Sequence, residues 1–238
     1  MMAVFCTNSI NIIAGVNGVE AGQTVVIAGS IVVFNLLQLH RLESQEWQHI
    51  LSICFLLPLC GTACGLLRFN WYPARVFVGD TFCYWAGMTI AVAGILGHFS
   101  KTMILFLLPQ VFNFVYSLPQ LFHLVPCPRH RLPKFDSEKN VVGMSFAEFK
   151  ASEAKPLGHV ALKIFELVGL LHREDFEKDG EMWIRISNLT ILNLILKFSG
   201  PMREDTLTAC FLVLQVAFSF VGLIIRFHLA GLVYDVVN

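Results

Sequence analysis

Three polar clusters stand out in this apolar sequence because each combines side chains that can handle phosphate or a hard metal ion. The first covers residues 8–18, the second residues 77–80 and the third residues 129–131. Carboxamide and carboxylate oxygens are ligands that Mg²⁺ accepts, and guanidinium groups match the geometry of phosphate oxygens. Together the clusters indicate phosphoryl transfer, with Mg²⁺ and arginines holding a diphosphate.

The first cluster places several carboxamides close to two glycines. Asn8, Asn11 and Gly15 follow the spacing i, i+3, i+7, which predicts that they share one helical face; Asn17 directly precedes Gly18. We expect the glycines to turn the chain and to bring backbone close to a ligand. The carboxamides would then donate to phosphate oxygens or offer a carbonyl to Mg²⁺. The alternative is that they cap a helix or bond to neighbouring helices.

The second cluster ends on a carboxylate at the start of an apolar segment. Asp80 is well placed to hold a hard cation at a membrane surface, but it would equally serve as the N-cap of the helix that follows. Phe77 is either an interfacial anchor or a platform for a flat ring. The pattern leaves both alternatives open.

The third cluster lies among three prolines within residues 126–133. Proline favours extended backbone, so Arg129 and Arg131 would project to one side and His130 to the other. Two guanidinium groups on one side would clamp a diphosphate. The alternative is a positively charged juxtamembrane group that contacts anionic lipid.

The elements that must position these clusters are apolar segments of membrane-spanning length. The chain is 55% hydrophobic and 14% charged, which excludes an ordinary soluble domain, and its zero net charge argues against nucleic-acid binding. Five segments of about 18 or more residues lack Asp, Glu, Lys and Arg, and each is long enough to cross a bilayer as a helix. We therefore predict an all-α polytopic membrane protein with about five transmembrane helices, at 21–39, 49–67, 82–100, 102–122 and 206–225.

If each segment crosses once, all three clusters emerge on the same side of the membrane. That side also carries seven of the Lys and Arg residues near span ends, against three on the other, which predicts that it is cytoplasmic. The sequon at Asn188 lies on this side, so we expect it to carry no glycan.

We expect one membrane domain over residues 1–238, with residues 123–205 as a cytoplasmic insertion that carries the Arg-His-Arg motif. Within it, the alternating stretch 141–146 predicts a small β-hairpin. The apolar stretches 157–172 and 189–198 predict helices that lie on the membrane or against the bundle. The charged stretch 173–181 predicts a solvated turn.

These motifs resemble those of the polyprenyl-phosphate N-acetylhexosamine-1-phosphate transferases. Residues 8–22 resemble a signature of that family, and residues 71–84 and 126–131 are similar to its eukaryotic branch. The resemblance covers nearly the whole chain but only the C-terminal half or so of the family's proteins, so we expect this chain alone to be inactive.

The resemblance implies transfer of N-acetylglucosamine 1-phosphate from UDP-GlcNAc to dolichyl phosphate, with release of UMP. This reaction would open N-glycan precursor synthesis at the cytoplasmic face of the endoplasmic reticulum membrane, and family members form homodimers. Two alternatives are a non-catalytic membrane fragment that pairs with the full-length enzyme and a nucleotide-sugar transporter. The transporter is disfavoured because the predicted spans contain no Asp, Glu, Lys or Arg.

The resemblance also implies a role for each candidate residue. Asn11 and Asp80 would be the Mg²⁺ ligands, and Asn17 and Phe77 would address the uracil. The arginines and the histidine of the third cluster would contact the diphosphate and the GlcNAc, and residues 4–12 would line the approach of the lipid phosphate. The full set of candidates is Asn8, Asn11, Gly15, Asn17, Phe77, Asp80, Arg129, His130 and Arg131.

Overall fold

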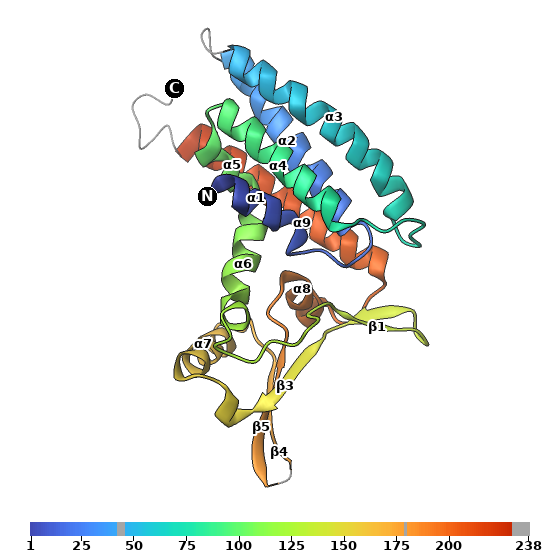
Figure 1. The fold of residues 1–238 in the computed structure, drawn as a ribbon, viewed down its shortest axis with the longest axis vertical. Helices are drawn as coiled ribbons and strands as arrows, with labels where there is room; N and C mark the ends of the chain where they lie inside the picture. Colours follow the sequence, from blue (N-terminus) through green and yellow to red (C-terminus); the bar gives the residue numbers. More distant parts are fainter. Residues whose placement is uncertain (42–45, 179, 230–238) are drawn as a thin grey trace. The chain divides into compact units, whose positions relative to one another are not determined.

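The computed structural model describes residues 1–41, 46–178 and 180–229. They form two compact units: unit 1, Met1–Val111 with Thr208–Asn238, and unit 2, Phe112–Leu207. Unit 1 holds the long helices and unit 2 holds two small sheets (Figure 1). The all-α expectation is therefore right for the described part of unit 1, whereas unit 2 mixes helices and strands beyond the predicted hairpin.

Unit 1 is built from helices that bury their apolar residues against one another. Its core contains large side chains that are fully shielded from solvent, among them Phe34, Met103 and Phe106. The helices are α1 (Met2–Asn11), α2 (Val19–Arg41), α3 (Glu46–Asn70), α4 (Asp80–Leu96), α5 (Ser100–Phe106), the first turn of α6 (Leu108–Leu121), α9 (Glu204–Ile224) from Thr208 onward and the short π-helix η2 (Ile225–Leu229).

Three helices in the described residues are long and apolar enough to cross a membrane: Val19–Arg41, Trp47–Asn70 and Glu204–His228. A fourth candidate span exists only if α5 and α6 together form one span, and the axes of these two helices are bent by 74° relative to each other. Helix α4 is apolar but has 17 residues. The predicted count of five spans is not confirmed, so the assignment of sides that rests on it stays a prediction. Within the predicted loop 40–48, residues 42–45 lie outside the described part.

The bend between α5 and α6 follows from Pro109, which has no N–H to donate to the carbonyl of Leu105. Helix α9 covers this break. Gln215 Nε2 donates to the carbonyl of Phe106 at 2.9 Å, and a Cβ added at Gly222 would lie 3.2 Å from Leu105 Cβ. The predicted span 102–122 is therefore two helices. Pro109 removes the bond to the carbonyl of Leu105, and Gln215 of α9 satisfies the neighbouring carbonyl of Phe106.

Unit 2 combines antiparallel sheets with surface helices. A small hairpin exists, but β1 and β2 form it over residues 134–143; the predicted stretch 141–146 contains β2 and the start of β3, which lie in different sheets. Helices are present in both predicted stretches, although the first ends at Leu167 and not at residue 172. The elements are the remainder of α6, β1 (Lys134–Asp136), β2 (Val141–Gly143), β3 (Phe146–Lys150), the 3₁₀ turn η1 (Ala151–Glu153), α7 (Pro156–Leu167), β4 (Arg173–Lys178), β5 (Glu181–Ser187) and α8 (Ile191–Ser199).

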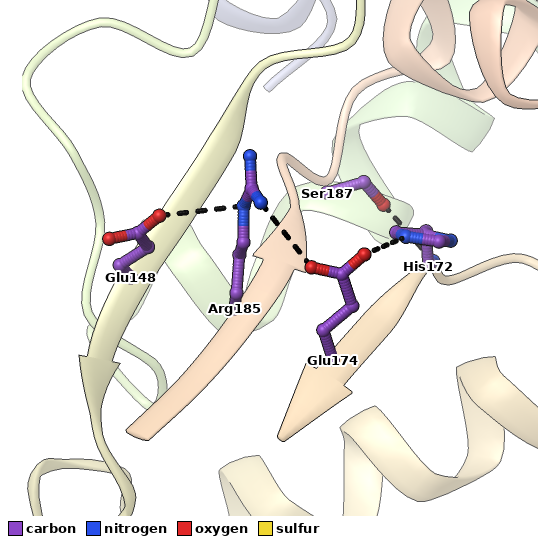
Figure 2. Close-up of polar contacts among 5 residues, drawn as sticks. All are labelled: Glu148, His172, Glu174, Arg185 and Ser187. Carbon is purple, nitrogen blue, oxygen red and sulfur yellow. Dashed lines mark hydrogen bonds and ion pairs between the residues drawn. The ribbon is translucent and has the colours of Figure 1, made fainter. Parts of the chain in front are cut away.

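The charged stretch predicted to be a turn is instead strand β4, in the sheet order β3-β5-β4; residue 179 lies outside the described part. Figure 2 shows why the charges are compatible with a strand: Arg185 of β5 lies between Glu148 of β3 and Glu174 of β4, with His172 beyond Glu174. Opposite charges on neighbouring strands stabilise an exposed sheet face. The prediction was wrong because charge density alone does not exclude a strand whose partner carries complementary charges.

The opposite face of this sheet forms the core of unit 2. Phe149, Ile184 and Ile186 point into it and pack with Leu162 of α7, and all four are almost completely buried. The alternation of Ile184, Arg185 and Ile186 along β5 thus matches one solvated and one buried face.

Candidate active site

Helices α1 and α4 bring the first two clusters to one place in unit 1. The helices pack side by side and run in opposite directions (Figure 1). They touch at Gly87, where an added Cβ would lie 2.2 Å from the carbonyl oxygen of Cys6. From this contact Asn11 and Asp80 are each about one to two helical turns away, at about 5.4 Å per turn. The end of α1 and the start of α4 therefore lie at the same end of the helix pair.

Asn11 and Asp80 both keep oxygens available at this end. Neither side chain makes a hydrogen bond or ion pair with the described part of the chain, and Asp80 is exposed. The described residues contain no group of three or more His, Cys, Asp or Glu that would hold a metal alone. A pair of oxygen donors nonetheless fits Mg²⁺, which commonly takes one or two protein ligands and completes its shell with phosphate oxygens and water.

The structure removes one alternative for Asp80. Helix α4 begins at Asp80 with Gly79 as its N-cap, and no side chain makes a capping bond there. Asp80 is therefore not the N-cap. Phe77 precedes it with 84% of its surface exposed, an open ring that suits either stacking or anchoring.

The loop after α1 is held in a defined shape by bonds to its backbone. Glu20 is buried and its Oε1 accepts from the N–H of Gly15 at 2.8 Å. Asn70, at the end of α3, accepts from the N–H of Gly18 at 2.8 Å. Thr208 of α9 donates to the carbonyl of Asn17 at 2.7 Å. Three helices thus fix the backbone that follows the candidate metal ligand.

The glycines of this loop turn the chain as predicted, with φ of 108° at Gly15 and 87° at Gly18. The expected shared helical face is wrong for Gly15, because α1 ends at Asn11 and Gly15 lies beyond it. Asn8 is exposed and its Nδ2 donates to the carbonyl of Val4 at 2.7 Å, within its own helix. This bond agrees with the structural alternative for Asn8 and leaves its Oδ1 for other partners.

The third cluster belongs to unit 2, and its two arginines differ. Arg129 and His130 are exposed, whereas Arg131 is partly buried. One terminal nitrogen of Arg131, Nη1, is buried without a hydrogen-bond partner in the described chain, and desolvation lowers the pKa of this guanidinium. A buried cationic donor that lacks a partner is costly, so an anion bound there would relieve the cost.

A polar network anchors the backbone of this cluster. The carbonyl of Arg131 accepts from Asn193 Nδ2 at 3.0 Å and from Ser145 Oγ at 3.3 Å. Asn188 is 1% exposed. Its Nδ2 donates to Ser145 Oγ at 2.8 Å, and its Oδ1 accepts from Gln120 Nε2 at 3.0 Å. The sequon asparagine is therefore a structural residue of this network, and a glycan on it is incompatible with this fold.

Sequence reasoning missed the residues that hold the site in place. The sequence did offer a sign that Glu20 has a structural or functional role, because Glu20 is the sole acidic residue in residues 1–42. Two further residues gave no comparable sign: Asn70 is one polar residue at the end of an apolar run, and Asn193 is one polar residue inside another. Their roles depend on contacts with backbone 52 and 62 residues away in sequence.

Comparison with known proteins gives a consistent result. Residues 1–98 match the family model for glycosyl transferase family 4. The chain is 50% identical over 238 residues to the UDP-N-acetylglucosamine–dolichyl-phosphate N-acetylglucosaminephosphotransferase of Schizosaccharomyces pombe, covering 98% of the chain and 53% of that protein. The protein of the same name from Saccharomyces cerevisiae is 45% identical, covering 98% of the chain and 52% of the relative.

A bacterial protein shows a more distant similarity. The probable undecaprenyl-phosphate N-acetylglucosaminyl 1-phosphate transferase of Bacillus subtilis is 30% identical over 205 residues, covering 83% of the chain and 53% of that protein. The chain thus spans about half the length of the curated relatives it matches.

Proposed function

We propose that this chain carries the metal- and diphosphate-binding part of a dolichyl-phosphate N-acetylglucosaminephosphotransferase. The support is its similarity to the enzymes of that name and, through residues 1–98, to the family model for glycosyl transferase family 4. The proposed reaction transfers N-acetylglucosamine 1-phosphate from UDP-GlcNAc to dolichyl phosphate. A phosphate oxygen of the lipid attacks the phosphorus that bears the sugar, the bond to the UMP oxygen breaks, and GlcNAc-diphosphate-dolichol and UMP are formed.

The observation that carries the proposal is the pair of available oxygens at the shared end of α1 and α4. Asn11 and Asp80 would hold Mg²⁺, which when bound neutralises charge on the diphosphate and on the departing UMP. The exposed ring of Phe77 would stack on the uracil, and Asn17 would address its polar edge. Asn8 and Gly15 would lie along the substrate beside them.

Arg129, His130 and Arg131 would contact the diphosphate and the sugar. The buried Nη1 of Arg131 would find its missing acceptor on a phosphate oxygen. Phosphoryl transfer needs positioning and charge stabilisation more than covalent help. The lipid phosphate is already an anion near neutral pH, so the proposal requires no strong general base.

The remaining parts of the proposal concern location and assembly. Three or four apolar helices support a multi-pass membrane protein. We place it in the endoplasmic reticulum membrane with the site facing the cytoplasm, because Lys and Arg near the predicted span ends favour that side. We also propose a homodimer, which size-exclusion chromatography with light scattering would detect.

The experiment is a transfer assay with UDP-GlcNAc, Mg²⁺ and dolichyl phosphate in vesicles. The chain alone is expected to give no product, and the chain combined with the N-terminal half of its S. pombe relative is expected to give GlcNAc-diphosphate-dolichol. In the combined protein, Asp80→Ala should lower turnover by about 10²-fold or more, since metal stabilisation of transition-state charge is worth several kcal/mol.

Glu177→Ala is the matched control, because this exposed carboxylate of β4 makes no ion pair within the described chain. Turnover by the chain alone would refute the expectation of inactivity. Full activity of the Asp80→Ala protein would remove Asp80 from the site.

A further inference from the structure

Helix α7 presents a continuous apolar face outward from unit 2. At helical spacing, residues 157, 160, 164, 167 and 168 fall within an arc of about 100°. The exposed fractions are large for aliphatic side chains: Leu157 62%, Val160 52%, Ile164 53%, Leu167 88% and Val168 64%. A contiguous exposed apolar patch of this kind marks a docking surface.

The inner face of α7 packs closely against other elements of unit 2, so the helix cannot rotate to bury these residues. A Cβ added at Gly158 would lie 2.2 Å from the carbonyl oxygen of Leu124. Leu162 is fully buried, and the ring of Phe165 lies 5.2 Å from that of Tyr116. The outward direction of the apolar face is therefore fixed by close packing within unit 2.

Two exposed lysines accompany this helix. Lys155 precedes the helix and Lys163 lies on its flank, and both are exposed without an ion pair in the described chain. Glu166, the one acidic residue of the helix, lies on the opposite side and has Arg173 Nη1 3.6 Å from its carboxylate. An apolar stripe with a lysine flank suits the interface of an anionic bilayer, where aliphatic side chains enter the acyl region and lysines reach the head groups.

We propose that α7 lies in the plane of the membrane, with its apolar face inserted into the interface of an anionic phospholipid bilayer. Its 12 residues give a length of about 18 Å, too short to cross the hydrocarbon core. The bilayer is the occupant because unit 2 begins and ends within apolar helices: it starts inside α6 of the bent pair α5 and α6, and it ends inside the candidate span Glu204–His228. The inference does not depend on the transferase activity.

The test places a tryptophan on each side of α7 in the full chain, reconstituted in vesicles of phosphatidylcholine and phosphatidylserine. Ile164→Trp and Leu167→Trp probe the outer face, and Glu166→Trp is the control on the other side. The fluorescence of the unsubstituted chain is subtracted. We expect phospholipids with brominated acyl chains to quench the added fluorescence at 164 and 167 at least about threefold more than at 166, as for an interfacial helix.

Three outcomes would overturn the proposal. Equal quenching at 164 and 166 by aqueous acrylamide would show a solvated helix. Protection at 164 and 167 from both quenchers would show that protein, such as a second copy of the chain, covers the face. Equal bromolipid quenching at 164, 166 and 167 would show no orientation.

The contribution of charge is tested by the double variant Lys155→Glu and Lys163→Glu. It should weaken bromolipid quenching at 167 in anionic vesicles and leave that quenching unchanged in pure phosphatidylcholine. Unchanged quenching in both kinds of vesicle would overturn the contribution of charge.

Discussion

At the scale of single residues, the candidate site depends on which polar side chains have no hydrogen-bond partner within the described chain. Glu20 and Asn70 accept backbone N–H groups of the loop after α1, so their side chains serve structure. Asn11 and Asp80 have no such partners in the described chain. Residue type alone cannot separate these cases, because a carboxamide or carboxylate suits both roles, and the separation comes from the contacts of the folded chain.

The sheet of unit 2 offers a pH-dependent test of the residue contacts in Figure 2. A hydrogen bond from His172 and the charge of Arg185 lower the pKa of Glu174 below its ordinary value. A carboxylate whose pKa is lowered by folding stabilises the protein above its unfolded pKa and loses that contribution as the pH falls. The Tm difference between the wild type and Glu174→Gln should therefore be largest near neutral pH and shrink below about pH 4.3, the ordinary glutamate pKa.

Glu177→Gln on the same strand is the control and should show no such pH-dependent difference. The measurement is thermal unfolding of the detergent-solubilised chain between pH 7 and the acid limit of stability. A Glu174→Gln difference that stays constant across this range would contradict the assigned contacts.

At the scale of elements, close approach between helices determines the geometry of the site. Gly87 allows α4 to touch the backbone of α1, and Gly22 allows α2 to approach Leu212 of α9, where an added Cβ would lie 2.8 Å from Leu212 Cδ1. A side chain at either position would need the neighbour to move. The helices themselves were predictable from apolar runs, but these contacts were not, since hydropathy does not report which faces meet.

Gly87→Ala is expected to separate α1 from α4. The added Cβ would lie 2.2 Å from Cys6 O and 2.6 Å from Thr7 Cα, both backbone atoms that cannot rotate away. We expect a loss of about 1–3 kcal/mol in unfolding free energy, typical of overpacking, and weaker binding of Mg²⁺ with UDP-GlcNAc because Asn11 moves relative to Asp80.

Gly61→Ala on α3 is the matched control, because nothing lies within 4 Å of its added Cβ and alanine favours a helix over glycine. Thermal unfolding and equilibrium binding on both variants provide the readout. Equal stability and equal binding in the two would show that the α1–α4 contact does not position the site.

At the scale of the whole molecule, sequence reasoning reached the membrane class, the presence of a small hairpin (though with other bounds) and the surface helices, because these follow from local composition and periodicity. It failed where distant residues decide. Strand β4 pairs with β5, whose Arg185 lies 3.3 Å from the carboxylate of Glu174. Among the candidate residues, it foresaw the turning glycines but placed Gly15 on the helical face of α1, which ends four residues earlier.

The central claim is that Asn11 and Asp80, at the shared end of α1 and α4 in unit 1, act together on one metal-bound diphosphate. A double-mutant cycle of Asn11→Ala and Asp80→Ala measures this most directly. The readout is the affinity for Mg²⁺ with UDP-GlcNAc of the chain combined with the N-terminal half of a curated relative. Shared substrate contacts predict a coupling of about 0.5–3 kcal/mol between the two substitutions, while their effects on stability without ligand should add. Additive effects on binding, with both single variants folded, would contradict a common site.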